Sequence, residues 1–97
     1  MGKYVYIYTG GGMAATEEEQ QKAMAAWGAW FGSLGDKVVD GGAPFGASGA
    51  VNGSAKTGAT GYSIVSAGSL DDAVALAGSC PILANGGNVE VFEAMEM

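Results

Sequence analysis

The sequence contains no histidine and no arginine, and both absences limit its chemistry. Histidine is the commonest general base and metal ligand near neutral pH. Arginine supplies the forked guanidinium that usually recognises carboxylate and phosphate groups. Four scattered lysines stand against ten acidic residues, so the net charge is −6. Because such a chain repels a phosphate backbone, we expect no nucleic-acid partner, and nothing indicates a cofactor or metal.

Cysteine and long apolar runs are also scarce. The single cysteine, Cys80, cannot form an intramolecular disulfide, which fits a reducing compartment. No apolar run approaches the roughly 18 residues of a membrane span, and the start at Met1 leads into a short alternating segment rather than a signal sequence. We therefore expect a cytoplasmic protein with no membrane partner, folded as one domain over residues 1–97.

The segment Tyr4-Val5-Tyr6-Ile7-Tyr8 alternates strictly between aromatic and β-branched residues. This pattern predicts a central strand with two apolar faces. We expect Val5 and Ile7 to pack against helices. The three tyrosines then form the opposite face, whose cover must meet their hydroxyl groups.

Two helices are predicted by capping patterns. Thr16 and Glu19 form a capping box, and Gly35 is a suitable end for the helix that follows. Its apolar stripe consists of Met24, Trp27, Phe31 and Leu34, flanked by Ala23 and Trp30. Gly28 and Gly32 inside it imply close approach of another backbone or ring.

The second helix repeats the capping pattern with Ser69 and Asp72 and is expected to stop at Pro81. Its apolar positions are Leu70, Val74 and Ala77, joined by Ala73, Leu76 and Cys80.

The remaining strands are predicted at 37–40, 60–66 and 88–95, with Gly41-Gly42 ending or bulging the first of them. Segment 41–61 carries seven glycines and the turn pair Asn52-Gly53, which favours a weak hairpin. The order predicts an α+β domain with a ferredoxin-like βαββαβ split motif: an antiparallel sheet, two helices on one face, and strands one and three central. The uncovered tyrosine face predicts a two-fold homodimer.

Together these segments resemble the YCII-related (DGPF) domain family of the dimeric α+β barrel superfamily. The residues that carry the resemblance cover nearly the whole chain: Tyr4 to Tyr8, Trp27-Gly28-Ala29-Trp30-Phe31, Val38-Val39-Asp40-Gly41, Tyr62 to Ala67, Ser69 to Ala73, and Gly86 to Val91. The resemblance implies a homodimeric α+β barrel with facing sheets and a cleft able to hold a small molecule.

The resemblance also implies a chemistry that this sequence does not match. For some relatives a His-Asp pair has been proposed as catalytic, in a role like that of small lactone isomerases or dehalogenating lyases. This chain has no histidine, so the pair cannot be carried over. The family's Asp-Gly-Pro-Phe signature is also absent, and we do not equate Gly42-Ala43-Pro44-Phe45 with it.

Tyrosine hydroxyls are the best candidates for ligand contacts. We expect Tyr6, Tyr8 and Tyr62 to offer hydroxyl groups, with Phe45 nearby. Trp27, Trp30 and Phe31 could form an aromatic wall for a ligand, but the helical spacing of Trp27 and Phe31 favours the core. Trp30 falls off the main helical stripe, so we place it at a pocket lip or interface.

Asp40 is the only catalytic candidate, because it ends an apolar strand and burial there would raise its pKa. A solvated turn residue is the more ordinary interpretation. Glu90 and Glu93 lie on opposite faces of the last strand, where a paired structural role outweighs catalysis. Cys80 is expected to be an inert buried thiol.

Gly10, Gly12 and Ala15 spell the form of a dinucleotide-binding loop. The acidic residues that open the following helix would oppose a pyrophosphate. A flexible turn is therefore preferred.

Three functions remain open. The sequence favours a homodimeric domain that binds a small organic molecule. The alternatives are an isomerase or lyase that uses Asp40 and tyrosines, and a purely structural dimerisation module.

Overall fold

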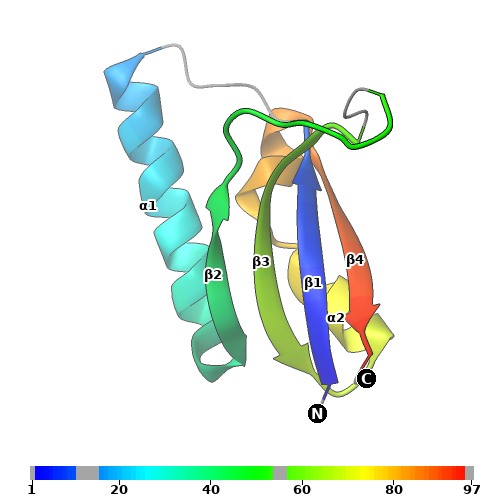
Figure 1. Ribbon diagram of the computed structural model, residues 1–97. Coiled ribbons are helices and arrows are strands. Elements are labelled where there is room, and N and C mark those ends of the chain that lie inside the picture. The colour runs from blue at the N-terminus through cyan, green and yellow to red at the C-terminus, as the bar shows by residue number, and fades with distance from the viewer. Residues whose placement is uncertain (1, 11–15, 54–56, 96–97) are drawn as a thin grey trace.

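A computed structural model describes residues 2–10, 16–53 and 57–95 as a four-stranded antiparallel sheet with two α-helices (Figure 1). In chain order the elements are β1 (Gly2–Thr9), α1 (Glu17–Leu34), the 3-10 turn η1 (Gly35–Lys37), β2 (Val38–Pro44), β3 (Ala59–Ala67), α2 (Leu70–Ala77), the 3-10 turn η2 (Pro81–Asn85) and β4 (Asn88–Ala94). The strand order β2-β3-β1-β4 places β1 and β3 at the centre. The predicted α+β class is confirmed, and the arrangement is compatible with a ferredoxin-like fold.

The faces of β1 are the reverse of the prediction. Tyr4, Tyr6 and Tyr8 are buried under the helical layer, whereas Val5 and Ile7 stay half-exposed on the other face. In Figure 1, α2 and η2 lie behind β1 and β4, and the front of the sheet carries no helix.

The tyrosines can be buried because the helical side offers acceptors for their hydroxyls. Tyr6 donates a hydrogen bond to the carbonyl oxygen of Ala73 in α2 at 2.5 Å. Its ring stacks on the indole of Trp30, with centroids 6.1 Å apart. A buried phenol ring removes more apolar area from water than a valine side chain does. A tyrosine whose hydroxyl is hydrogen-bonded therefore stabilises the core more than Val5 or Ile7 would in its place.

Helix α1 begins and ends as predicted, because Thr16 accepts a hydrogen bond from the Glu19 amide at 3.1 Å and Gly35 caps the C-terminus. Its buried stripe is shifted from the prediction. Trp30 is only 4% exposed and lies in the core rather than at a pocket lip, whereas Met24 is 75% exposed. The buried side of α1 includes Trp30 because the Trp30 ring stacks on Tyr6, which lies on the buried face of β1.

The predicted close approach at Gly28 and Gly32 is wrong. A Cβ atom added at either position would meet nothing within 4 Å. Both glycines lie on the exposed side of α1, so they lower its helical propensity without allowing a contact.

Helix α2 buries a narrower stripe than predicted, formed by Ala73 and Ala77 and continued by Cys80. Leu70 and Val74 are exposed. The side of α2 that carries Ala73 faces the sheet, where the Ala73 carbonyl oxygen accepts the hydrogen bond from the Tyr6 hydroxyl. The helix ends at Ala77, and Pro81 opens η2 instead of ending α2.

The glycine-rich segment forms one hairpin, not the separate weak hairpin predicted within 41–61. Strands β2 and β3 pair with two register shifts, between Val38 and Asp40 and between Asp40 and Ala43, so β2 is bulged at the glycines. The described residues between Pro44 and Ala59 form no strand. At the other end of the chain, β4 stops at Ala94, one residue earlier than predicted.

The side of the sheet that carries no helix is called the open face. Val5 pairs with Ile64 on β3 and Phe92 on β4, and Ile7 pairs with Tyr62, so these apolar side chains form adjacent rows. In the part of the chain that the structure describes, no helix is long and apolar enough to cross a membrane.

Candidate functional site

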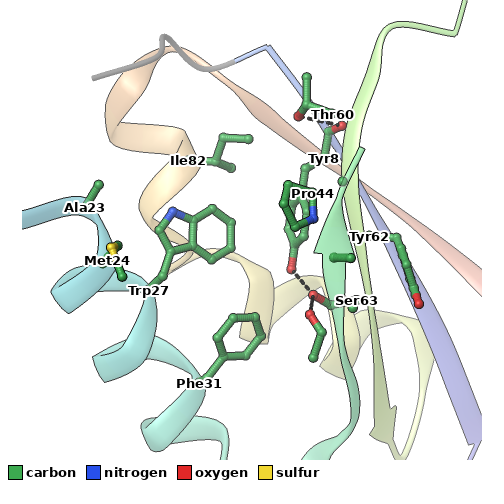
Figure 2. A pocket seen from close by; sticks show the side chains of 14 residues that line it. Tyr8, Ala23, Met24, Trp27, Phe31, Pro44, Thr60, Tyr62, Ser63 and Ile82 are labelled. Atoms are coloured by element: carbon green, nitrogen blue, oxygen red, sulfur yellow. Dashed lines mark hydrogen bonds between the residues drawn. The ribbon is translucent and has the colours of Figure 1, made fainter. Parts of the chain in front are cut away.

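A cleft of about 560 Å³ separates α1 from the β2–β3 hairpin on the helical side of the sheet. Figure 2 shows Trp27 and Phe31 on α1 lining this space, with Tyr8 and Ser63 lining it from the sheet. The cleft is lined by Tyr8, Ala23, Met24, Trp27, Phe31, Gly41, Gly42, Ala43, Pro44, Thr60, Gly61, Tyr62, Ser63 and Ile82.

The cleft exists because α1 packs through only part of its length. Its described residues from Glu17 to Ala26 are exposed, apart from the half-buried Ala23. The later aromatic residues Trp27, Trp30 and Phe31 contact one another and the tyrosines of β1. In Figure 1 the first half of α1 stands apart from the β2–β3 hairpin, and Ala23 and Met24 from this half line the cleft.

The aromatic wall is fixed by ring contacts. Trp27 meets Tyr8 edge to face with centroids 5.1 Å apart, and Phe31 lies 5.9 Å from Trp27. Such geometries stabilise aromatic pairs beyond the area they bury. The wall is therefore formed before any ligand arrives.

The sheet side of the cleft carries a chain of hydrogen bonds. The Tyr8 hydroxyl donates to Ser63 Oγ at 2.8 Å, and Ser63 Oγ donates to the carbonyl oxygen of Gly41 at 2.8 Å. Thr60 Oγ1 donates to the carbonyl oxygen of Tyr8 at 3.2 Å. The bulge in β2 brings Gly41 within reach of Ser63, so the backbone irregularity and the polar chain depend on each other.

The cleft has no charged side chain among the lining residues that the structure describes. Burial raises the pKa of Tyr8, with the Ser63 hydrogen bond opposing that shift, so the phenol stays protonated far above neutral pH. Burial likewise raises the pKa of Tyr6 to about 12. The site is thus neutral over the physiological range.

The residues expected to contact a ligand do not converge. Tyr8 lines the cleft, Tyr6 is fully buried beneath it, and Trp30 is part of the core. Phe45 and Tyr62 stack on each other with centroids 5.7 Å apart, and Figure 2 shows the Tyr62 ring directed away from the cleft.

Asp40 is an exposed strand residue at the bulge of β2, not the turn residue that was the more ordinary expectation. Its Oδ1 accepts a hydrogen bond from the Gly42 amide at 2.8 Å, and its Oδ2 accepts one from the Tyr62 hydroxyl at 3.5 Å. It does not line the cleft. The structure therefore gives this carboxylate a local role in shaping the β2 bulge.

Cys80 is buried, and burial raises the pKa of its thiol, as expected for an unreactive cysteine. Glu90 and Glu93 are both exposed, since β4 is an edge strand. Of the suggested dinucleotide loop only Gly10 can be placed, because Gly12 and Ala15 lie outside the described residues. Among the described residues, no three His, Cys, Asp or Glu side chains gather as a metal site would require.

Trp27 and Phe31 are partly buried against the core and also line the cleft, so they combine the core position that periodicity favoured with the aromatic wall weighed beside it. One feature of the cleft was missed from the sequence. Ser63 was not considered, although a serine between apolar neighbours in a strand is a usable signal. With Tyr8 assigned to the opposite face, its partner could not be recognised.

No protein-family model, curated protein or solved structure matches this chain. Its function is therefore argued from the geometry of the cleft and of the open face.

Proposed function

We propose that this domain binds a small organic molecule in the cleft between α1 and the β2–β3 hairpin. The observation that carries the proposal is a preformed aromatic lining, in which Trp27 contacts Tyr8 and Phe31 contacts Trp27, beside an open space of about 560 Å³. Pockets for small molecules commonly measure about 300–1,000 Å³ and are mainly apolar with a few placed polar groups. This cleft fits both criteria.

The competing proposal of an isomerase or lyase finds less support. It needs Asp40 and a tyrosine hydroxyl to meet at the ligand. Asp40 instead lies outside the cleft, next to Tyr62, and the Tyr8 hydroxyl is engaged by Ser63. Binding without catalysis is the function that this geometry favours.

We also propose that the domain is a homodimer that pairs through its open face. Val5, Ile7, Tyr62 and Ile64 form an apolar surface there, bordered by Phe92, which is 52% exposed. The carboxylates of Glu90, beside Ile7, and of Asp40, beside Ile64, lie at its two edges. The resemblance to dimeric α+β barrel proteins supports the pairing. Because the tyrosines of β1 are buried under the helices, the proposed interface is the Val5 face rather than the tyrosine face.

Ligand binding is tested by filling the cleft from one helix position. Ala23 lines it, whereas Ala26 is exposed on the same helix and does not. Indole and benzofuran are titrated by calorimetry into the wild type, Ala23→Trp and Ala26→Trp. We expect binding to the wild type and Ala26→Trp, and at least about tenfold weaker binding to Ala23→Trp. No binding of any aromatic probe to the wild type would refute the proposal.

The dimer is tested by sedimentation at micromolar concentration. Ile64→Glu places a charge in the centre of the open face, whereas Val74→Glu places one on the exposed side of α2. We expect a dimer for the wild type and Val74→Glu, and a monomer for Ile64→Glu. A monomeric wild type would contradict the pairing.

A further inference from the structure

The hydroxyl groups around the cleft limit which ligands it can bind, because each of them already donates its proton in a hydrogen bond within the protein. Ser63 Oγ has one proton, and the carbonyl oxygen of Gly41 can only accept, so Ser63 must donate to Gly41. Toward Tyr8, Ser63 can then act only as an acceptor, and the Tyr8 proton is consumed by that bond. The direction of both hydrogen bonds, from Tyr8 to Ser63 and from Ser63 to Gly41, follows from the number of protons alone.

The other hydroxyls are committed in the same way. Thr60 donates to the carbonyl oxygen of Tyr8. Tyr62 donates to Asp40 on the far side of the sheet. The indole N–H of Trp27 is the remaining side-chain donor among the described lining residues, and Figure 2 shows the indole nitrogen on the side facing Ala23, away from Tyr8.

On the sheet side of the cleft, the hydroxyl oxygens can therefore accept a hydrogen bond from a ligand but cannot donate one. A phenol oxygen that donates its proton still has lone pairs, and Figure 2 places the Tyr8 hydroxyl facing the space in front of Phe31. A ligand that brings an N–H or O–H group can donate to it. A ligand that brings only acceptors finds no hydroxyl proton there, and its polar atom is desolvated without replacement.

Charge narrows the class further. An anionic ligand would enter a cleft whose described lining has no cation, in a protein of net charge −6. Its desolvation would be uncompensated. A cationic ligand would likewise find no carboxylate in that lining.

From these hydroxyl directions we propose that the ligand is a neutral aromatic molecule that donates a hydrogen bond, through N–H or O–H, to the phenol oxygen of Tyr8. The proposal rests on ligand binding in the cleft and specifies the ligand class. It predicts a preference for donors over acceptors that shape and hydrophobicity alone would not produce.

The test compares three probes of nearly one shape by calorimetry on the full chain. Indole carries an N–H donor, benzofuran replaces that group with an oxygen that cannot donate, and indole carboxylate adds a negative charge. We expect indole to bind about 3- to 10-fold more tightly than benzofuran, and indole carboxylate to bind at least about 10-fold more weakly than indole. Water solvates indole better than benzofuran, so the expected order opposes simple partitioning.

Tyr8→Phe provides the matched variant, because it removes the acceptor and keeps the ring. The ratio of indole to benzofuran affinity should fall to one or below, because only the partitioning that favours benzofuran remains, and a loss of stability would not alter a ratio measured within one variant. Benzofuran or indole carboxylate binding the wild type as tightly as indole would overturn the ligand class while leaving binding in the cleft intact. A ratio unchanged in Tyr8→Phe would overturn the role of Tyr8. Failure of all three probes to bind would instead refute the proposed function.

Discussion

The hydroxyl of Tyr6 donates a hydrogen bond to the carbonyl oxygen of Ala73 at 2.5 Å, joining the central strand to α2 inside the core. Tyr6 is fully buried, and this bond satisfies its hydroxyl on the helical side of the sheet.

Removing that hydroxyl should destabilise the fold. Tyr6→Phe leaves the Ala73 carbonyl without its tyrosine donor, and we expect the free energy of unfolding to fall by about 1–3 kcal/mol. Urea unfolding followed by circular dichroism measures this loss. Tyr62→Phe is the control, since its hydroxyl is exposed, and it should change stability by less than about 0.5 kcal/mol. Equal effects for the two variants would contradict the buried bond.

Alkaline pH should weaken the fold through the same residue. Burial raises the pKa of Tyr6 from 10.0 to about 12, so the unfolded chain loses this proton first. The stabilisation is complete below pH 10 and is lost as pH rises toward 12, by about 1 kcal/mol at pH 11. Burial raises the pKa of the Cys80 thiol above its ordinary 9.0, which acts in the same direction from about pH 9.

Unfolding in urea at a series of pH values from 8 to 11.5 checks this dependence. Tyr6→Phe should reduce the decline above pH 10 without abolishing it, because burial also raises the pKa of Tyr8, and Cys80→Ala should reduce the onset of the decline. Stability that stays constant from pH 9 to 11.5 would exclude these shifts.

The bulge in β2 should tolerate a side chain at one glycine and reject it at the next. Gly42 has φ +77°, and a Cβ there would lie 1.7 Å from the carbonyl oxygen of Tyr62. At Gly41 a Cβ would meet nothing within 4 Å. We expect Gly42→Ala to lower the free energy of unfolding by about 2–4 kcal/mol and Gly41→Ala to change it by less than about 1 kcal/mol. Thermal and urea unfolding distinguish the two, and equal tolerance would argue against the bulge.

Helix α1 should gain stability when Gly28 is replaced by alanine. The added methyl group meets nothing within 4 Å, so only the gain in helical propensity remains, about 0.5–1 kcal/mol. Gly35→Ala is the contrasting variant, since φ at Gly35 is +56° and the substitution should destabilise by about 1–2 kcal/mol. A destabilising Gly28→Ala, seen in urea unfolding, would show that another surface packs against this helix.

Local sequence determined where the elements begin and what they are. Thr16 and Ser69 cap the two helices as their spacing predicts, and the alternation from Tyr4 to Tyr8 specifies a strand. These features depend on contacts within a few residues, so the order of strands and helices could be derived without the fold.

Only the tertiary structure decided which way the elements face. Both faces of β1 are apolar, so alternation cannot choose between them, and the choice falls to distant partners: Ala73 for the Tyr6 hydroxyl and Ser63 for the Tyr8 hydroxyl. The same orientation of β1 explains why Trp30 lies in the core beside Tyr6 and not at the predicted pocket lip. The cleft likewise depends on how far α1 stands from a bulged hairpin, which no local pattern encodes. Local periodicity specifies that a face is apolar, and only long-range hydrogen bonds and ring packing specify what covers it.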